Sequence, residues 1–192
     1  MSSSTIREQT AAPHEFPVVP DDHWVERLHD GSYVLIRQLR QEDRAREIEF
    51  IRRLSPDSRR ARFLSEFREP SPALVDQMMT VDGDRSAAFV ALVHDDGTLR
   101  EIGISRYGAT SEPDTGECAI SVADDWQRRG LGTILMRRAM GMALRHGYRR
   151  MISLDAASND TMHHFTHRLG FSRCTDPDDG TQVIHSIDLV GA

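Results

Sequence analysis

The residues from Gln127 to Thr133, Gln-Arg-Arg-Gly-Leu-Gly-Thr, have the types and the spacing of a phosphate-binding turn. They stand between a strand-like run at 119–122 and a segment with helical spacing that begins at Leu131. Glycine lets the backbone come close to an anion, and the first N–H groups of a helix have no partner within the helix. Two arginines add long cationic side chains. The pattern predicts phosphate binding by Gln127, Arg128, Arg129, Gly130, Leu131, Gly132 and Thr133.

Two common nucleotide-binding patterns do not fit this turn. The Walker pattern requires a lysine where the chain has Thr133, and the dinucleotide pattern requires a third glycine where it has Leu135. The turn does match the Gln-x-x-Gly-x-Gly signature of the Gcn5-related N-acetyltransferase (GNAT) family, in which it carries the pyrophosphate of acetyl coenzyme A. For these residues taken alone, the alternative is an ordinary glycine-containing turn between a strand and a helix.

Two further stretches resemble the same family, in the same order along the chain. Upstream, Gly-Glu-Cys-Ala-Ile-Ser-Val at 116–122 resembles the family's fourth strand, which has a glutamate at its start. Downstream, Ser158 and Asn159 precede a helical stretch that ends in Leu-Gly-Phe at 169–171. Within the family, the run at 52–59 is similar to the acetyltransferase domain of bacterial protein-lysine acetyltransferases.

The resemblance runs from about Tyr33 to Leu189 and implies the fold. We expect one GNAT-like α/β domain over 23–192, with a mixed, mostly antiparallel sheet of about six to seven strands flanked by about four to five helices. Residues 1–22 are rich in Ser, Thr and Pro, which predicts a flexible N-terminal arm. Trp24 is expected to anchor 23–30 at the domain edge.

Apolar periodicity and turn residues place the individual elements. The expected strands are 33–39, 87–94, 100–107, 117–122, 151–154, 171–175 and 182–189. The expected helices are 42–54, 56–67, 71–79, 131–146 and a last helix capped by Ser158 and ending near Arg168.

Glu117 is the candidate general base. An amine is nucleophilic only when it is neutral, and a lysine ammonium has a pKa of about 10.4, so direct acetyl transfer needs a proton acceptor. The resemblance assigns this role to Glu117, which stands where the family has its catalytic glutamate. The nearest rivals are Asp124 and Asp125, which follow the same strand, and the structural alternative is that Glu117 is an ordinary surface carboxylate.

The resemblance also implies how acetyl coenzyme A is held. The fourth and fifth strands part, and the pantetheine arm pairs with main-chain groups of Ile120, Val122 and Ala123, with an N–H near Val122 for the oxyanion. Asn159 would hold the same arm through its amide, the alternative being a polar residue in the first turn of its helix. Many relatives carry a tyrosine acid where this chain has Thr166, whose hydroxyl is too weak an acid. Water or another group would then protonate the leaving thiolate.

Composition excludes several other classes of function. The net charge is −6 and the arginines are scattered, which argues against nucleic-acid binding. No apolar run approaches the ~18 residues that cross a bilayer, so no membrane partner is expected. Two cysteines do not make a disulfide framework, which favours a cytoplasmic location. His163 and His167 have helical i, i+4 spacing but no third ligand, so we expect no metal.

The sequence therefore predicts an acyltransferase that moves an acetyl group from acetyl coenzyme A directly to a primary amine. A protein lysine is the favoured acceptor because of the resemblance at 52–59, and a small-molecule amine is the alternative. A non-catalytic acyl-CoA-binding sensor is a second alternative, since the tyrosine acid is missing. The pattern does not predict the oligomeric state.

Overall fold

The computed structural model describes residues 23–189, and the arm predicted for 1–22 lies outside them. One eight-stranded sheet runs through this part of the chain in the order β1-β2-β3-β4-β5-β6-β8-β7. Neighbouring strands pair antiparallel, except that β5 and β6 are parallel. The strands are β1 His23–Arg27, β2 Tyr33–Gln38, β3 Ala87–Asp95, β4 Thr98–Ala109, β5 Thr115–Val122, β6 Arg150–Ala156, β7 Ser172–Thr175 and β8 Gln182–Asp188.

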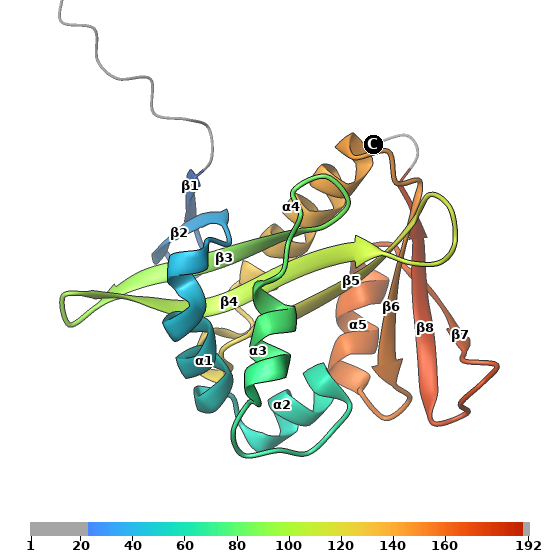
Figure 1. Cartoon of the computed structure of the whole chain (residues 1–192), viewed down its shortest axis with the longest axis horizontal. Helices are drawn as coiled ribbons and strands as arrows, with labels where there is room; N and C mark the ends of the chain where they lie inside the picture. The colour runs from blue at the N-terminus through green and yellow to red at the C-terminus, as the bar shows by residue number, and fades with distance from the viewer. Residues whose placement is uncertain (1–22, 190–192) are drawn as a thin grey trace, which may run out of the picture.

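Helices cover both faces of the sheet (Figure 1). In this view α1, α2 and α3 lie in front of the sheet and α4 lies behind it. The helices are α1 Arg44–Arg53, α2 Pro56–Phe63, α3 Pro72–Met79, α4 Leu131–Arg145 and α5 Asp160–Arg168, with short 3-10 turns at Gln41–Asp43 and Asp124–Trp126. The single α/β domain predicted from the sequence is confirmed.

Side chains alternate between two apolar cores because successive residues of a strand point to opposite faces. In β3, Val90 and Leu92 pack with α1 and α3, whereas Phe89 and Ala91 pack with α4. The α4 core also contains Cys118 of β5. The helices therefore hold β3, β4 and β5 from both sides, which fixes where β5 ends and α4 begins.

Serine caps and prolines start two of the front helices. Ser55 accepts a hydrogen bond from the Ser58 N–H at 3.2 Å and is followed by a proline at the first position of α2. Ser71 caps α3 in the same way, again followed by proline, as predicted.

The structure corrects the predicted elements in three places. β1 is an eighth strand that the sequence did not predict, although Trp24 does anchor this segment against Phe89, with ring centroids 6.1 Å apart. The helix expected over 56–67 ends at Phe63, because Leu64 adopts a left-handed φ of 51° and the chain turns back. The last helix is capped by Asn159 and not by Ser158.

Two buried acids lie on the front side of the sheet. Glu47 of α1 and Glu101 of β4 are almost fully buried and lie against each other, and within residues 23–189 their carboxylates have no hydrogen-bond partner besides each other. Burial and the neighbouring Glu47 charge raise the pKa of Glu101 well above its usual range. By contrast, the buried carboxylate of Asp43 receives two hydrogen bonds from Arg37, at 2.6 and 2.7 Å.

Candidate active site

The glycine turn presents backbone N–H groups that have no hydrogen-bond partner among residues 23–189. The first hydrogen bond of α4 runs from the Ile134 N–H to the Gly130 carbonyl, so the N–H groups of 131–133 precede the helical ladder. No side chain caps this helix start. Three free donors at a helix start, where the helix dipole is positive, are suited to the oxygens of a phosphate.

The two glycines are needed for different reasons. Gly130 has a φ of 93°, and a Cβ there would lie 2.8 Å from the His29 ring, so a side chain is excluded by conformation and by space. At Gly132 a Cβ would lie 3.3 Å from the ring of Phe165 on α5. Gly132 therefore lets the start of α4 approach the second half of α5, which the sequence pattern did not indicate.

The two arginines of the turn have different roles. Arg129 donates to Asp30 at 2.8 Å, and its guanidinium lies 4.6 Å from the centre of the Trp126 ring. It ties the turn to the loop between β1 and β2, so its side chain is committed to the fold. Arg128 has a left-handed φ of 61°, and its exposed side chain forms no ion pair within residues 23–189. Of the predicted pair, Arg128 is the cation that remains available to a ligand.

The parallel pairing of β5 and β6 is short and leaves a gap. Pairing covers only 115–117 of β5 and 150–152 of β6. Beyond it, β5 continues along β4 to Val122, and β6 continues along β8 to Ala156. The facing edges of 118–122 and 153–156 therefore part, with main-chain groups unpaired between them. Such an edge can accept an extended ligand as an added strand.

Main-chain direction in β5 determines which amides face this gap. The Ala123 N–H donates to the Ile102 carbonyl at 2.9 Å, on the side of β4. Because amides alternate along a strand, the N–H groups of Val122 and Ile120 point to the opposite edge, toward the gap. The Val122 carbonyl accepts the Gln127 side chain at 3.2 Å. Ala123 and Gln127 thus use these groups within the fold, whereas Ile120 and Val122 keep free amides.

Glu117 lies at the closed end of the gap, where it pairs in register with Ile152. Its neighbour Cys118 points into the α4 core, so the Glu117 side chain points to the front face, where α2 crosses β5 and β6. The side chain is exposed, and no described residue ties its carboxylate by a hydrogen bond or ion pair. An accessible, unbonded carboxylate at this place is free to take a proton.

The front face beside Glu117 also contains a cation. Burial and the neighbouring Arg106 lower the pKa of the Arg62 guanidinium of α2 to about 10, and the Glu117 charge acts in the opposite direction. Arg62 therefore remains cationic at neutral pH, and its charge interacts with the Glu117 carboxylate. Its guanidinium lies 3.9 Å from the Met78 sulfur and 5.0 Å from the centre of the Phe63 ring.

The rival acids Asp124 and Asp125 are both engaged. Asp124 accepts hydrogen bonds from the Ser55 N–H at 2.9 Å, the Ser55 hydroxyl at 2.8 Å and the Ser58 hydroxyl at 2.7 Å. Partial burial opposes them, but these bonds hold the pKa of Asp124 below its usual range, which makes it a weaker base. Asp125 pairs with Arg100 at 3.2 Å. Asp124 fastens α2 to the end of β5.

Helix α5 borders the gap and carries the remaining predicted residues. The Asn159 side-chain oxygen accepts from the Met162 N–H at 3.1 Å, so this oxygen caps the helix and only the NH₂ of the amide is left for a ligand. Thr166 is buried, and its hydroxyl donates back to the Met162 carbonyl at 2.9 Å. Its hydroxyl is therefore used within its own helix.

A buried polar array joins α5 to the sheet. Asp155 of β6 lies 2.9 Å from Nδ1 of His185 on β8, and His185 Nε2 lies 3.1 Å from Nδ1 of His163 on α5. The ring of His163 also contacts the Ala157 carbonyl at 2.9 Å through Nε2. Sequence reasoning missed this array, because its members are far apart along the chain.

Neither a metal nor a reactive thiol is supported near the gap. Within residues 23–189 no group of three or more His, Cys, Asp or Glu side chains is placed to hold a metal ion. Burial, with the neighbouring Asp155 charge, raises the pKa of the Cys118 thiol to about 12, so it is an unreactive packing group.

In the described part of the chain, no helix has the length and apolar character required to span a membrane.

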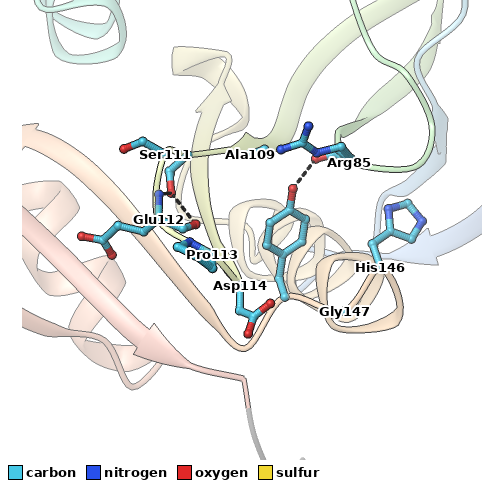
Figure 2. Close-up of a pocket in the computed structure, with 10 residues that line it drawn as sticks. Arg85, Ala109, Ser111, Glu112, Pro113, Asp114, His146 and Gly147 are labelled. Atoms are coloured by element: carbon cyan, nitrogen blue, oxygen red, sulfur yellow. Dashed lines mark hydrogen bonds between the residues drawn. The ribbon is translucent and has the colours of Figure 1, made fainter.

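A separate hollow of about 370 Å³ lies at the other end of α4. Figure 2 shows it between Arg85, the loop from Ala109 to Asp114, and His146 and Gly147 at the end of the helix. Tyr148 closes one side by donating to the Arg85 carbonyl at 2.8 Å. A helix of 15 residues separates this hollow from the glycine turn, which is about 22 Å along the axis. It is not part of the gap.

Comparison with known proteins identifies relatives across most of the chain. The family model described as the acetyltransferase (GNAT) family matches residues 35–171. "Acetyltransferase PA5475" of Pseudomonas aeruginosa is 55% identical over 174 residues, which cover 91% of this chain and 94% of that protein.

Solved structures show the same fold at lower identity. The GNAT domain of S. lividans PAT superposes with a TM-score of 0.79 at 22% identity, covering 91% of this chain and 99% of that one. A Salmonella typhimurium structure, yncA, described as a putative acetyltransferase with its cofactor acetyl-CoA, gives a TM-score of 0.65 at 19% identity, covering 84% of this chain and 96% of that one.

Proposed function

The chain belongs to the GNAT family of acetyltransferases and uses acetyl coenzyme A as its cosubstrate, and on that premise we propose that it acetylates a lysine of another protein with Glu117 as general base. The observation that carries the proposal is the exposed, unbonded Glu117 carboxylate at the closed end of the β5–β6 gap. An acceptor on a protein surface needs such an open approach, whereas a small amine is more often enclosed.

Acetyl coenzyme A binds from the turn inward in this proposal. Its pyrophosphate accepts hydrogen bonds from the free N–H groups of 131–133 and pairs with the Arg128 side chain. Its pantetheine arm pairs with the amides of Ile120 and Val122. The NH₂ of Asn159 is left to meet the same arm from α5. The thioester then lies toward Glu117, because the gap closes there.

Acetyl transfer follows from these positions. Glu117 takes a proton from the lysine ammonium, and the neutral nitrogen attacks the thioester carbon. The Val122 N–H stabilises the oxyanion of the tetrahedral intermediate. The carbon–sulfur bond breaks, and the acetyl group stays on nitrogen, which loses its second proton to water. Water in turn gives a proton to the thiolate, since the Thr166 hydroxyl is occupied within α5.

The run at 52–59 supports the protein acceptor. Its Ser55 and Ser58 hold the start of α2 on Asp124, so the residues that resemble protein-lysine acetyltransferases build the helix that crosses the front of the gap.

Cys118 and Cys174 are both unpaired, which is consistent with the reducing cytoplasm that we propose as the location of the protein.

The test is incubation with radiolabelled acetyl coenzyme A and a cell extract, followed by separation of protein from small molecules. We expect label on protein lysines with the wild-type enzyme and with Asp125→Asn, and no label with Glu117→Gln. Label confined to a small amine would overturn the protein acceptor. Binding of acetyl coenzyme A without transfer to any fraction would instead indicate a sensor.

A further inference from the structure

A second hollow, of about 340 Å³, lies on the flank of α4 that faces the N-terminal strands. It is lined by Trp24, Glu26, Phe89, Ile134, Arg137, Arg138, Gly141 and Arg145. Ile134 follows Gly132 by two residues and therefore points about 200° around the helix from it. Since Gly132 faces Phe165 of α5, this hollow is on the opposite flank of α4 from the coenzyme gap.

The floor of the hollow is apolar. The rings of Trp24 and Phe89 meet with centroids 6.1 Å apart, and Ile134 packs beside them in the α4 core. Arg138 lies over the Trp24 ring at 3.9 Å and forms an ion pair with Glu26. This pair neutralises the single acid of the hollow and holds the indole in place.

Two cations at the hollow have no carboxylate partner. Arg137 and Arg145 are exposed, and neither forms an ion pair with a described residue. The Arg145 guanidinium lies 3.4 Å from the Met142 sulfur. The whole protein has a net charge of −6, so the positive charge at this hollow is opposite in sign to the charge of the protein as a whole. Guanidinium groups are suited to carboxylate and phosphate oxygens.

Gly141 is not explained by the packing of the chain. It lies inside α4, where glycine costs about 1 kcal/mol relative to alanine. Its φ is ordinary, and the nearest atom to a Cβ placed there would be the Arg145 guanidinium at 4.0 Å. The fold would therefore accept a side chain. The absence of one keeps the hollow open and exposes helix backbone to whatever lies in it.

We propose that this hollow is a binding site for a small planar aromatic anion. The flat ring packs against the half-buried side chains of Trp24 and Ile134, crossing the helix at Gly141, and the anionic group is held by Arg137 and Arg145. An aromatic carboxylate and a nucleoside monophosphate share this chemistry. The site is separate from acetyl transfer, so it does not depend on the identity of the acceptor.

The experiment uses the full chain saturated with acetyl coenzyme A, so that the gap is filled. Anilinonaphthalene sulfonate, a fluorescent aromatic anion, is titrated into the wild type and into Arg137→Gln/Arg145→Gln. We expect at least about tenfold weaker binding in the double variant, with the affinity for acetyl coenzyme A unchanged. Arg149→Gln/Arg150→Gln removes the same charge from exposed arginines outside the hollow and should bind the probe like the wild type.

A second variant separates binding from folding. Gly141→Leu fills the hollow with a better helix former, so the melting temperature should be equal or higher while probe affinity falls at least about tenfold. Displacement of the probe by benzoate or by adenosine monophosphate would support the site and tell the two ligand sources apart. Unchanged probe affinity in either hollow variant, or displacement by neither compound, would overturn the proposal.

Discussion

The two ends of strand β5 carry acidic residues in opposite circumstances. Glu117, near the start of the strand, has an exposed carboxylate that no described residue ties down. Asp124, just past the end, receives three hydrogen bonds from Ser55 and Ser58. The first end is free for chemistry and the second end is an attachment point for α2. The glycine turn repeats this division, because Arg128 has no ion-pair partner in the described part of the chain, whereas Arg129 is paired with Asp30.

This contrast shows that the type of a residue and its proximity to the gap do not by themselves identify the reactive group. Both acids lie on the same strand or directly after it, and both are near the gap. Hydrogen bonds from α2 lower the pKa of Asp124 and fix its carboxylate, so it loses basicity while it gains a structural role. The following substitutions test this division, from the largest expected effect to the smallest.

Replacement of the free acid should have the largest effect. Glu117→Gln keeps the shape of the side chain but removes its basicity, so we expect kcat to fall by ~10²–10⁴ with the Kd of acetyl coenzyme A nearly unchanged. Steady-state assays of thiol release measure both. Asp125→Asn is the matched control and should stay near wild type. Partial recovery of the Glu117→Gln rate at high pH is also expected, and normal turnover at neutral pH would remove Glu117 from the mechanism.

A third acid, Glu101, extends the comparison because it is buried away from solvent against another acid, Glu47. Its pKa is raised, so the protonated form is stabilising below the ordinary pKa of glutamate, and that stability is lost as the pH rises toward the folded-state value. Glu101→Gln should match the wild type at low pH and exceed it by about 1–3 kcal/mol above neutral pH. Chemical unfolding across the pH range measures this. Parallel wild-type and variant curves would contradict it.

Replacement of the tied acid should affect stability and not chemistry. Asp124→Ala removes three hydrogen bonds at a partly exposed site, which we expect to cost about 1–2 kcal/mol in the free energy of unfolding. Because the pKa of Asp124 is lowered, its contribution is present above about pH 4 and is lost as the pH falls further. The variant and the wild type should therefore converge in acid. A large fall in kcat with unchanged stability would break the comparison.

The two arginines should separate in the same way. Arg128→Gln should weaken acetyl coenzyme A about tenfold, the effect of one charge-assisted contact, with little change in melting temperature. Arg129→Gln should lower the melting temperature, because it loses Asp30 and Trp126, and should leave the affinity of the folded protein nearly unchanged. Calorimetric titration and thermal unfolding distinguish the two results. Equal loss of affinity in both variants would show that Arg129 also meets the ligand.

The smallest effect is expected at the position of the missing tyrosine acid. Thr166→Ala removes a hydroxyl that bonds only to its own helix, so kcat should stay within about twofold and stability should fall by about 0.5–1.5 kcal/mol. A fall in kcat comparable to that of Glu117→Gln would show that the hydroxyl has a role in proton transfer.

Local patterns predicted the parts of the site that local sequence controls. The glycine turn, the start of α4 and the strand that carries Glu117 were all found from neighbouring residues. β1 was not predicted as a strand, since His-Trp-Val-Glu-Arg is short and rich in charge and owes its conformation to pairing with β2. The early end of α2 depends on Leu64 in a left-handed conformation, which residue type does not favour.

Long-range contacts account for the rest. Arg129 and its partner Asp30 are 99 residues apart, so their pairing could not be read from the turn. Ser55 and Asp124 are 69 residues apart, and only their contact shows that this acid is not available as a base. The free amides of the gap depend on where β5 and β6 stop pairing, which is set by the packing of whole strands.

The attachment of α5 to the sheet depends on direction as well as on contact. Apolar side chains keep most of their contacts when a helix turns slightly, whereas a hydrogen bond weakens steeply when its donor leaves the line of the acceptor. A series of polar contacts runs from Asp155 through His185 and His163 to the Ala157 carbonyl, at 2.9, 3.1 and 2.9 Å. These contacts therefore set the rotation of α5 about its own axis, and with it the direction in which Asn159 presents its NH₂ to the gap.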